Sequence, residues 1–140
     1  MAGFPESIMV IDDDPAILEV EELALQRVGN IVIKTCEDCG KALTAAREGF
    51  VPDLILLDLK MPDRDGTVAV REFRAYDRLA RVTIVGALGV AMHDEYGVLG
   101  VIGVIHKPFK PSDLIMKIQK MWQTHCFGRA GEGKGKPENS

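Results

Sequence analysis

The sequence predicts an α/β fold of the (βα)5 type, in which five strands alternate with five helices. Five short runs of apolar and β-branched residues have the length of buried strands. Segments with apolar residues at helical spacing separate these runs. Strands that alternate with helices indicate a doubly wound parallel sheet, because right-handed crossovers place the helices on its faces. We expect the common strand order 2-1-3-4-5.

The five predicted strands differ in how clearly the sequence marks them. The run 54–57 reads Leu-Ile-Leu-Leu, which is typical of a parallel strand that is covered on both faces. The second strand is the most mixed in composition, because it includes a lysine. The predicted strands are residues 8–11, 31–34, 54–57, 82–85 and 101–105.

The predicted helices begin and end at recognisable residues. Asp14 is a candidate N-cap, and Pro15 suits the first turn of the helix that follows. We expect one stripe of this helix to face the core, formed by Ile17, Val20, Ala24 and Val28. The remaining helices are predicted near residues 41–48, 69–76, 92–99 and 112–125. The Gly-rich polar segment after them predicts a domain at 7–125 and a flexible tail at 126–140.

Composition excludes several functional classes. A formal net charge of −4 gives no basic surface for direct nucleic-acid binding. No apolar run approaches the ~18 residues of a membrane span, so we expect no membrane insertion. Three cysteines are too few for a disulfide framework, which favours a cytoplasmic location.

Acidic residues follow two predicted strands that the expected order makes neighbours. Asp12 and Asp13 follow the first strand and Asp58 follows the third, so the three carboxylates should converge. Close carboxylates repel unless a cation neutralises them, and an oxygen-rich site suits Mg²⁺, with Mn²⁺ as the alternative. Lys107 follows the fifth strand and adds a positive charge. A metal, a lysine and an ionised carboxylate together suit phosphoryl transfer.

Three motifs make the chain similar to a known family. They are "VIDDDP" (10–15), "DLILLDLKMPDRDG" (53–66) and "HKPF" (106–109). In this order and spacing they resemble the receiver domain of bacterial two-component response regulators. The resemblance covers about residues 7–125 and implies a flavodoxin-like fold.

The resemblance also implies roles for individual residues. Asp58 would accept a phosphoryl group from a sensor histidine kinase or a histidine phosphotransfer protein, and a downstream protein would be the target. Asp12, Asp13, Asp58 and the backbone carbonyl of Lys60 would hold the metal, and Lys107 would pair with the phosphoryl group. No independent enzyme activity is expected beyond Mg²⁺-dependent self-phosphorylation and autodephosphorylation on Asp58. In the family the bond that corresponds to Lys107–Pro108 is usually cis.

Two positions depart from the family pattern. The fourth strand of a receiver normally ends in Thr or Ser followed by Ala, whereas this chain has Gly86 and Ala87. The fifth strand normally carries Tyr or Phe three residues before the lysine, whereas this chain has Val104. Because the hydroxyl and the ring transmit phosphorylation in the family, the usual switch is incomplete here.

These departures leave two functional hypotheses. The first is a phosphoacceptor receiver, either standing alone or as a fragment of a longer regulator. The alternative is a degenerate receiver that binds a protein partner whether or not it is phosphorylated. A phosphatase of the haloacid-dehalogenase type is disfavoured, because Lys60 stands where that family needs a second acid. A redox role for Cys36 and Cys39 is disfavoured by the acidic residues between them.

Overall fold

A five-stranded sheet forms the centre of the molecule. The computed structural model describes residues 3–61, 64–79, 82–88, 100–107 and 109–135. The sheet has the order β2-β1-β3-β6-β7, and all of its neighbouring strands are parallel. The predicted order is confirmed, since β6 and β7 are the fourth and fifth strands of this sheet. Its strands are β1 (Ser7–Ile11), β2 (Val32–Cys36), β3 (Leu54–Asp58), β6 (Thr83–Leu88) and β7 (Val101–His106).

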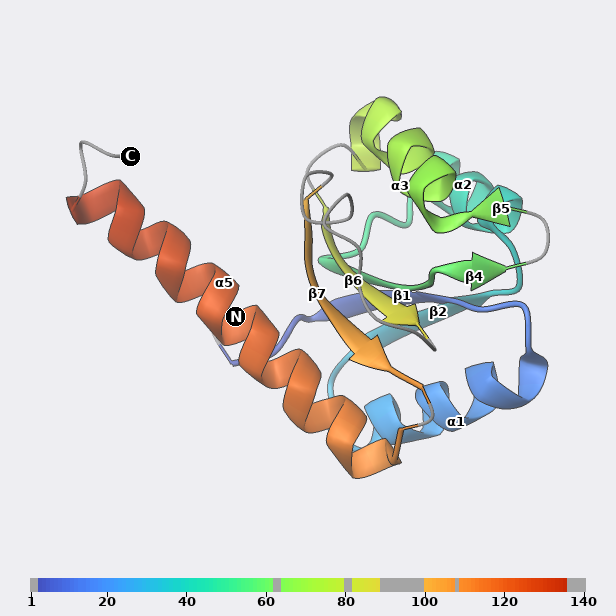
Figure 1. The fold of residues 1–140 in the computed structure, drawn as a ribbon, viewed down its shortest axis with the longest axis horizontal. Helices are drawn as coiled ribbons and strands as arrows, with labels where there is room; N and C mark the ends of the chain where they lie inside the picture. Colours follow the sequence, from blue (N-terminus) through green and yellow to red (C-terminus); the bar gives the residue numbers. More distant parts are fainter. Residues whose placement is uncertain (1–2, 62–63, 80–81, 89–99, 108, 136–140) are drawn as a thin grey trace.

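Helices cover both faces of the sheet, as a doubly wound fold requires. Figure 1 shows α1 (Pro15–Gln26) and α5 (Pro111–Gly135) on one face, and α2 (Cys39–Arg47) and α3 (Gly66–Ala75) on the other. A short 3-10 helix, η1 (Asp77–Leu79), follows α3. The predicted helix at 92–99 and the Lys107–Pro108 bond involve positions outside the described residues.

Alternating side chains of the central strands fill two separate core layers. In β1, Met9 and Ile11 belong to the layer under α2 and α3, whereas Ile8 and Val10 belong to the layer under α1 and α5. The side chains of β3 alternate in the same way, and all five of its residues are buried. A strand with two buried faces is expected to be apolar, and the first four residues of β3 follow this rule. Asp58, the last residue of β3, is buried as well and is the polar exception.

A small antiparallel ladder that the sequence did not predict follows β3. Its strands are β4 (Lys60–Met61) and β5 (Arg64–Asp65), in which Lys60 is paired with Asp65. The ladder returns the chain to the N-terminus of α3, so the segment after Asp58 is held close to the end of β3.

Helix α1 begins as predicted but buries a different face. The Asp14 carboxylate caps it by accepting a hydrogen bond from the Ala16 N–H at 2.9 Å. The predicted stripe is wrong at Val20, which is 39% exposed, and at Val28, which is 37% exposed, whereas Ala24 is buried as predicted. The buried face instead consists of Leu18, Glu21, Ala24 and Leu25. The glutamate interrupts the apolar pattern of this face, so the neighbouring row resembled the core side.

Helix α5 extends beyond the predicted end of the last helix. It continues to Gly135, so the expected boundary at residue 125 falls inside it. Leu114 and Ile118 anchor its first turns in the core layer that it shares with α1. Propagation of a formed helix adds one hydrogen bond for each residue that is ordered, which lets a packed helix continue into a weakly helical sequence. Among the described helices, none combines the length and apolar character that a membrane crossing requires.

Candidate functional site

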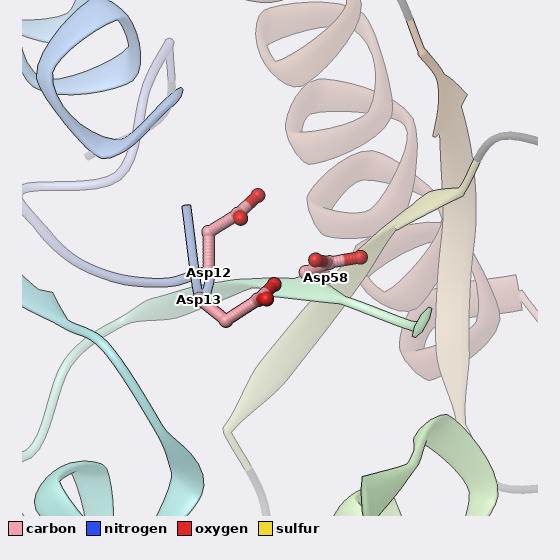
Figure 2. Close-up of side chains that lie close together, drawn as sticks. All are labelled: Asp12, Asp13 and Asp58. Carbon is pink, nitrogen blue, oxygen red and sulfur yellow. The ribbon is translucent and has the colours of Figure 1, made fainter. Parts of the chain in front are cut away.

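Three carboxylates meet at the carboxyl ends of two neighbouring strands. Asp12 and Asp13 follow β1, and Asp58 ends β3, which pairs directly with β1. One carboxylate oxygen from each residue lies within 4.8 Å of the others. Asp12 and Asp58 are buried, whereas Asp13 is exposed. Figure 2 shows the three side chains around one space at this edge of the sheet.

A lysine joins the two buried carboxylates. Lys107 follows β7, and its Nζ lies 2.9 Å from Asp12 Oδ2 and 3.3 Å from Asp58 Oδ2. Its side chain keeps 24% exposure, so the ammonium group lies at the border between the core and the solvent. The structure thus brings together four of the predicted site residues.

Backbone N–H groups hold the other oxygens of these carboxylates. The Asp14 N–H donates to Asp12 Oδ1 at 3.0 Å, and the Lys60 N–H donates to Asp58 Oδ1 at 3.0 Å. Each buried carboxylate therefore accepts one hydrogen bond from the backbone and one from the lysine. These hydrogen bonds fix the orientation of both carboxylate groups. The bond from the Lys60 N–H also holds the Lys60 backbone next to Asp58. The role of the Lys60 carbonyl as a metal ligand stays a prediction.

Burial and charge shift the ionisation of the site in opposite directions. Burial raises the pKa of Asp58 to about 6, against the hydrogen bond from the Lys60 N–H, which lowers it. Burial lowers the pKa of Lys107, but its hydrogen bond to Asp12 and the nearby charges outweigh this effect, so the pKa is raised overall. The lysine stays protonated at neutral pH, and one ammonium faces three carboxyl groups.

The donor set fits a hard divalent cation. All three converging side chains offer carboxylate oxygens, the ligand type that Mg²⁺ prefers. One lysine does not balance three carboxylates, so a second cation would relieve the remaining repulsion. The exposed Asp13 lies on the open side, which leaves room for the water ligands that Mg²⁺ usually keeps.

The two atypical switch positions lie beside this site. Gly86 of β6 pairs with Leu57 of β3 and with Val104 of β7. The next residue, Ala87, pairs with Asp58 and accepts a hydrogen bond from the Leu59 N–H at 2.9 Å. Val104 is partly buried and packs against the core layer under α2 and α3. Gly86 and Ala87 lie inside β6, which continues to Leu88 beyond the predicted end of this strand at residue 85, and the role of these positions in signalling stays a prediction.

Sequence reasoning missed two residues near the site. Glu21 of α1 is 1% exposed, and Asp12, Lys107 and Asp58 all influence its ionisation. Leu59 is fully buried between Gly66 and Gly86. For Glu21, the sequence offered one indication: a charged residue stands within a helical face that is otherwise apolar. No sequence pattern indicated Leu59, because its contacts join three separate segments.

The cysteine pair does not have the environment of a reactive thiol. Cys36 and Cys39 are both buried and carry no disulfide. Burial raises the pKa of the Cys36 thiol, which disfavours the nucleophilic thiolate. Both residues belong to the core layer under α2 and α3. We therefore assign both cysteines a packing role in this core layer.

The fold and the site together define a class of protein. A doubly wound sheet carries acidic residues after its first and third strands and a lysine after its fifth. The family model of the response regulator receiver domain matches residues 8–119. The chain belongs to this family.

Curated relatives agree with this assignment. The DNA-binding response regulator MtrA of Mycolicibacterium smegmatis is 33% identical over 119 residues, which cover 81% of this chain and 49% of MtrA. The transcriptional regulatory protein CssR of Bacillus subtilis is 32% identical over 120 residues, which cover 84% of this chain and 51% of CssR. The chain thus spans about half the length of the curated relatives it matches.

Solved structures show the same fold. The chemotaxis protein CheY4 of Vibrio cholerae superimposes with a TM-score of 0.74 at 24% identity, covering 82% of this chain and 97% of CheY4. The receiver domain of the sensor histidine kinase PA1611 of Pseudomonas aeruginosa is 30% identical, with a TM-score of 0.70, covering 84% of this chain and 97% of that domain. That structure holds a magnesium ion in its active-site cleft.

Proposed function

We propose that this chain is a phosphoacceptor in a two-component or phosphorelay pathway, with Asp58 as the acceptor. The main support for this proposal is the position of the Asp58 carboxylate, which is buried at the end of β3 and shares the Lys107 ammonium with Asp12. A sensor histidine kinase or a histidine phosphotransfer protein would be the donor. The membership in the receiver family supports this proposal.

The groups around Asp58 are suited to this phosphoryl transfer. A carboxylate oxygen of Asp58 attacks the phosphorus of a phosphohistidine; a P–O bond forms, the P–N bond breaks and the imidazole leaves with the electron pair. The product is an acyl phosphate on Asp58. Lys107 is placed to donate to the phosphoryl oxygens because its ammonium already lies 3.3 Å from the Asp58 carboxylate. The Lys60 N–H orients the acceptor through its hydrogen bond to Asp58 Oδ1.

Magnesium is the proposed cofactor of this reaction. Asp12, Asp13 and Asp58 would hold it, with the Lys60 carbonyl as a further ligand, and Mn²⁺ offers similar coordination. When bound, the cation supplies charge that offsets the repulsion between the carboxylates and the phosphoryl oxygens. The magnesium-bound PA1611 receiver domain supports this assignment.

The output of the chain is a change in affinity for a protein target. The MtrA relatives are described as DNA-binding, but this chain spans about half of their length. Its net charge of −4 argues against direct contact with nucleic acid by the part that is present. The pathway implies a cytoplasmic location, and reduced cysteines are compatible with it.

Mass spectrometry of the intact protein tests the proposal. Incubation with Mg²⁺ and a small phosphodonor should add the mass of one phosphoryl group to the wild type, and EDTA should prevent the addition. Asp58→Asn should show no addition, although its amide oxygen can still accept the Lys60 N–H. Asp77→Asn, a change at an exposed aspartate of η1, is the matched control and should be labelled like the wild type.

The degenerate-receiver alternative differs in what phosphorylation does to partner binding. It expects equal partner affinity with and without the phosphodonor, and no effect of Asp58→Asn on that affinity. Its support is the missing hydroxyl at Gly86, which concerns the switch and not the acceptor. Addition that persists in Asp58→Asn would reject Asp58 as the acceptor.

A further inference from the structure

Glu21 has an environment that packing does not explain. It lies on the inner face of α1, between Leu18 and Ala24, and is 1% exposed. Its Oε1 has no hydrogen-bond partner in the part of the chain that the structure describes. A buried polar atom without a partner is costly, and an apolar residue at this position would avoid the cost. Such an atom indicates a missing interaction.

The charged groups that act on Glu21 belong to the candidate site. The pKa of Glu21 is raised to about 8, mainly by burial and then by the charges of Asp12 and Asp58, against the charge of Lys107, which lowers it. These three groups come from the ends of β1, β3 and β7. From α5, the buried Leu114 and Ile118 complete the same core layer with apolar side chains. Among the described groups whose charges act on Glu21, Lys107 is the cation.

Lys107 has a reason to change its partner. Its side chain lines a pocket of 450 Å³ together with Phe109 and with Ile17 and Val20 of α1, a pocket that Glu21 itself does not line. The Lys107 ammonium is paired with the Oδ2 atoms of Asp12 and Asp58. These two carboxylates converge with that of Asp13 at the place where a divalent cation would bind. A divalent cation repels the ammonium and competes with it for these oxygens.

We propose that Glu21 is a second acceptor for Lys107, which receives the ammonium at Oε1 when a divalent cation occupies the site of Asp12, Asp13 and Asp58. This inference rests on the proposed function. Glu21 is then a positioning residue. The hydrogen bond from Lys107 gives its buried Oε1 a partner and keeps the lysine near Asp58. Because the displaced ammonium finds this second acceptor, the metal ion displaces it from Asp12 and Asp58 at a smaller cost in free energy, and metal binding is stronger.

Calorimetric titration with MgCl₂ at fixed pH and ionic strength tests this role. Glu21→Leu should weaken Mg²⁺ binding by about tenfold, the equivalent of one lost hydrogen bond to a charged group. Glu21→Gln should lose less, because its amide oxygen can still accept from the ammonium. Glu19→Gln removes a carboxylate from the exposed side of the same helix and should bind like the wild type. Circular dichroism establishes that each variant is folded.

A double-mutant cycle with Lys107→Met separates this role from a general effect of charge. Lys107→Met should strengthen Mg²⁺ binding, because the competing ammonium is gone, and Glu21→Leu should then have no further effect. Equal affinity of the wild type and both Glu21 variants would overturn the inference and leave the metal site intact. An unchanged tenfold loss in the Lys107→Met background would also overturn it. Absence of Mg²⁺ binding by the wild type would reject the proposed metal site itself.

Discussion

Leu59 occupies the space above Gly86 in which a larger residue would place its side chain. A Cβ atom at Gly86 would lie 2.9 Å from Leu59 Cγ and closer still to Leu59 Cδ1. Leu59 is fully buried, and it makes a similar close approach to Gly66, where a Cβ atom would lie 2.9 Å from the Leu59 carbonyl oxygen. The absence of a hydroxyl at Gly86 is therefore linked to Leu59, the residue that follows Asp58.

We expect Gly86→Thr to destabilise the protein by roughly 1–3 kcal/mol, since overpacking forces a buried neighbour to move. Leu59→Ala alone should cost about 2–5 kcal/mol through the cavity it leaves. Because the smaller residue makes room for the threonine, the double variant should lose less than the sum of the two changes. Urea unfolding measures all four free energies, and strict additivity would contradict the steric relationship.

Glu21 should make the protein less stable as the pH rises. Its pKa is about 8 in the folded state against an ordinary value of 4.5, so between these values the folded state binds more protons than the unfolded state. The free energy of unfolding should then fall by roughly 3 kcal/mol between pH 5 and pH 8 from this group. The pKa of Asp58 is also raised, so Asp58 lowers the free energy of unfolding in the same way as the pH rises to about 6.

Urea unfolding at pH 5, 6.5 and 8 in EDTA measures this dependence. Glu21→Leu should show a shallower decrease than the wild type, especially between pH 6.5 and pH 8, where Asp58 no longer contributes. Glu19→Gln should keep the wild-type slope, because its carboxylate is exposed. A Glu21→Leu protein with the full wild-type slope would show that Glu21 is ionised in the folded state.

Asp13 should contribute to metal binding without contributing to stability. It is exposed, whereas Asp12 and Asp58 are buried and paired with Lys107. Asp13→Asn should therefore weaken Mg²⁺ binding by about tenfold or more, because one anionic ligand is lost. Its free energy of unfolding in EDTA should stay within about 0.5 kcal/mol of the wild type. Calorimetry and urea unfolding test the two halves of this prediction, and unchanged Mg²⁺ affinity would remove Asp13 from the ligand set.

Arg74 ties α3 to the end of the sheet away from the site. Its guanidinium donates to the carbonyl oxygens of Leu79, Val82 and Gly100, the last at 3.2 Å. Burial lowers the pKa of Arg74, and a lysine cannot reproduce its planar fork of donors. Arg74→Lys should cost about 2 kcal/mol in urea unfolding. The exposed Arg71→Lys is the control and should be neutral; equal stability of both variants would contradict the role of Arg74.

The sequence by itself determined the architecture and the acidic half of the site. The apolar runs and their alternation with helices specified a doubly wound sheet, and the parallel order then required Asp12, Asp13 and Asp58 to meet. These features follow from local patterns and one topological rule, so the chain order was sufficient to derive them.

Only the tertiary structure decided which helix face is buried and what fills the space at the switch. Glu21 lies inside because α1 turns the face of Leu18 and Leu25 toward the sheet, although the sequence favoured the row of Ile17 and Val20. Leu59 meets Gly86 because β3 and β6 are adjacent, which no local pattern encodes. Both results depend on contacts between distant segments. Such contacts are selected by the packing of the whole core, and local propensity does not determine them.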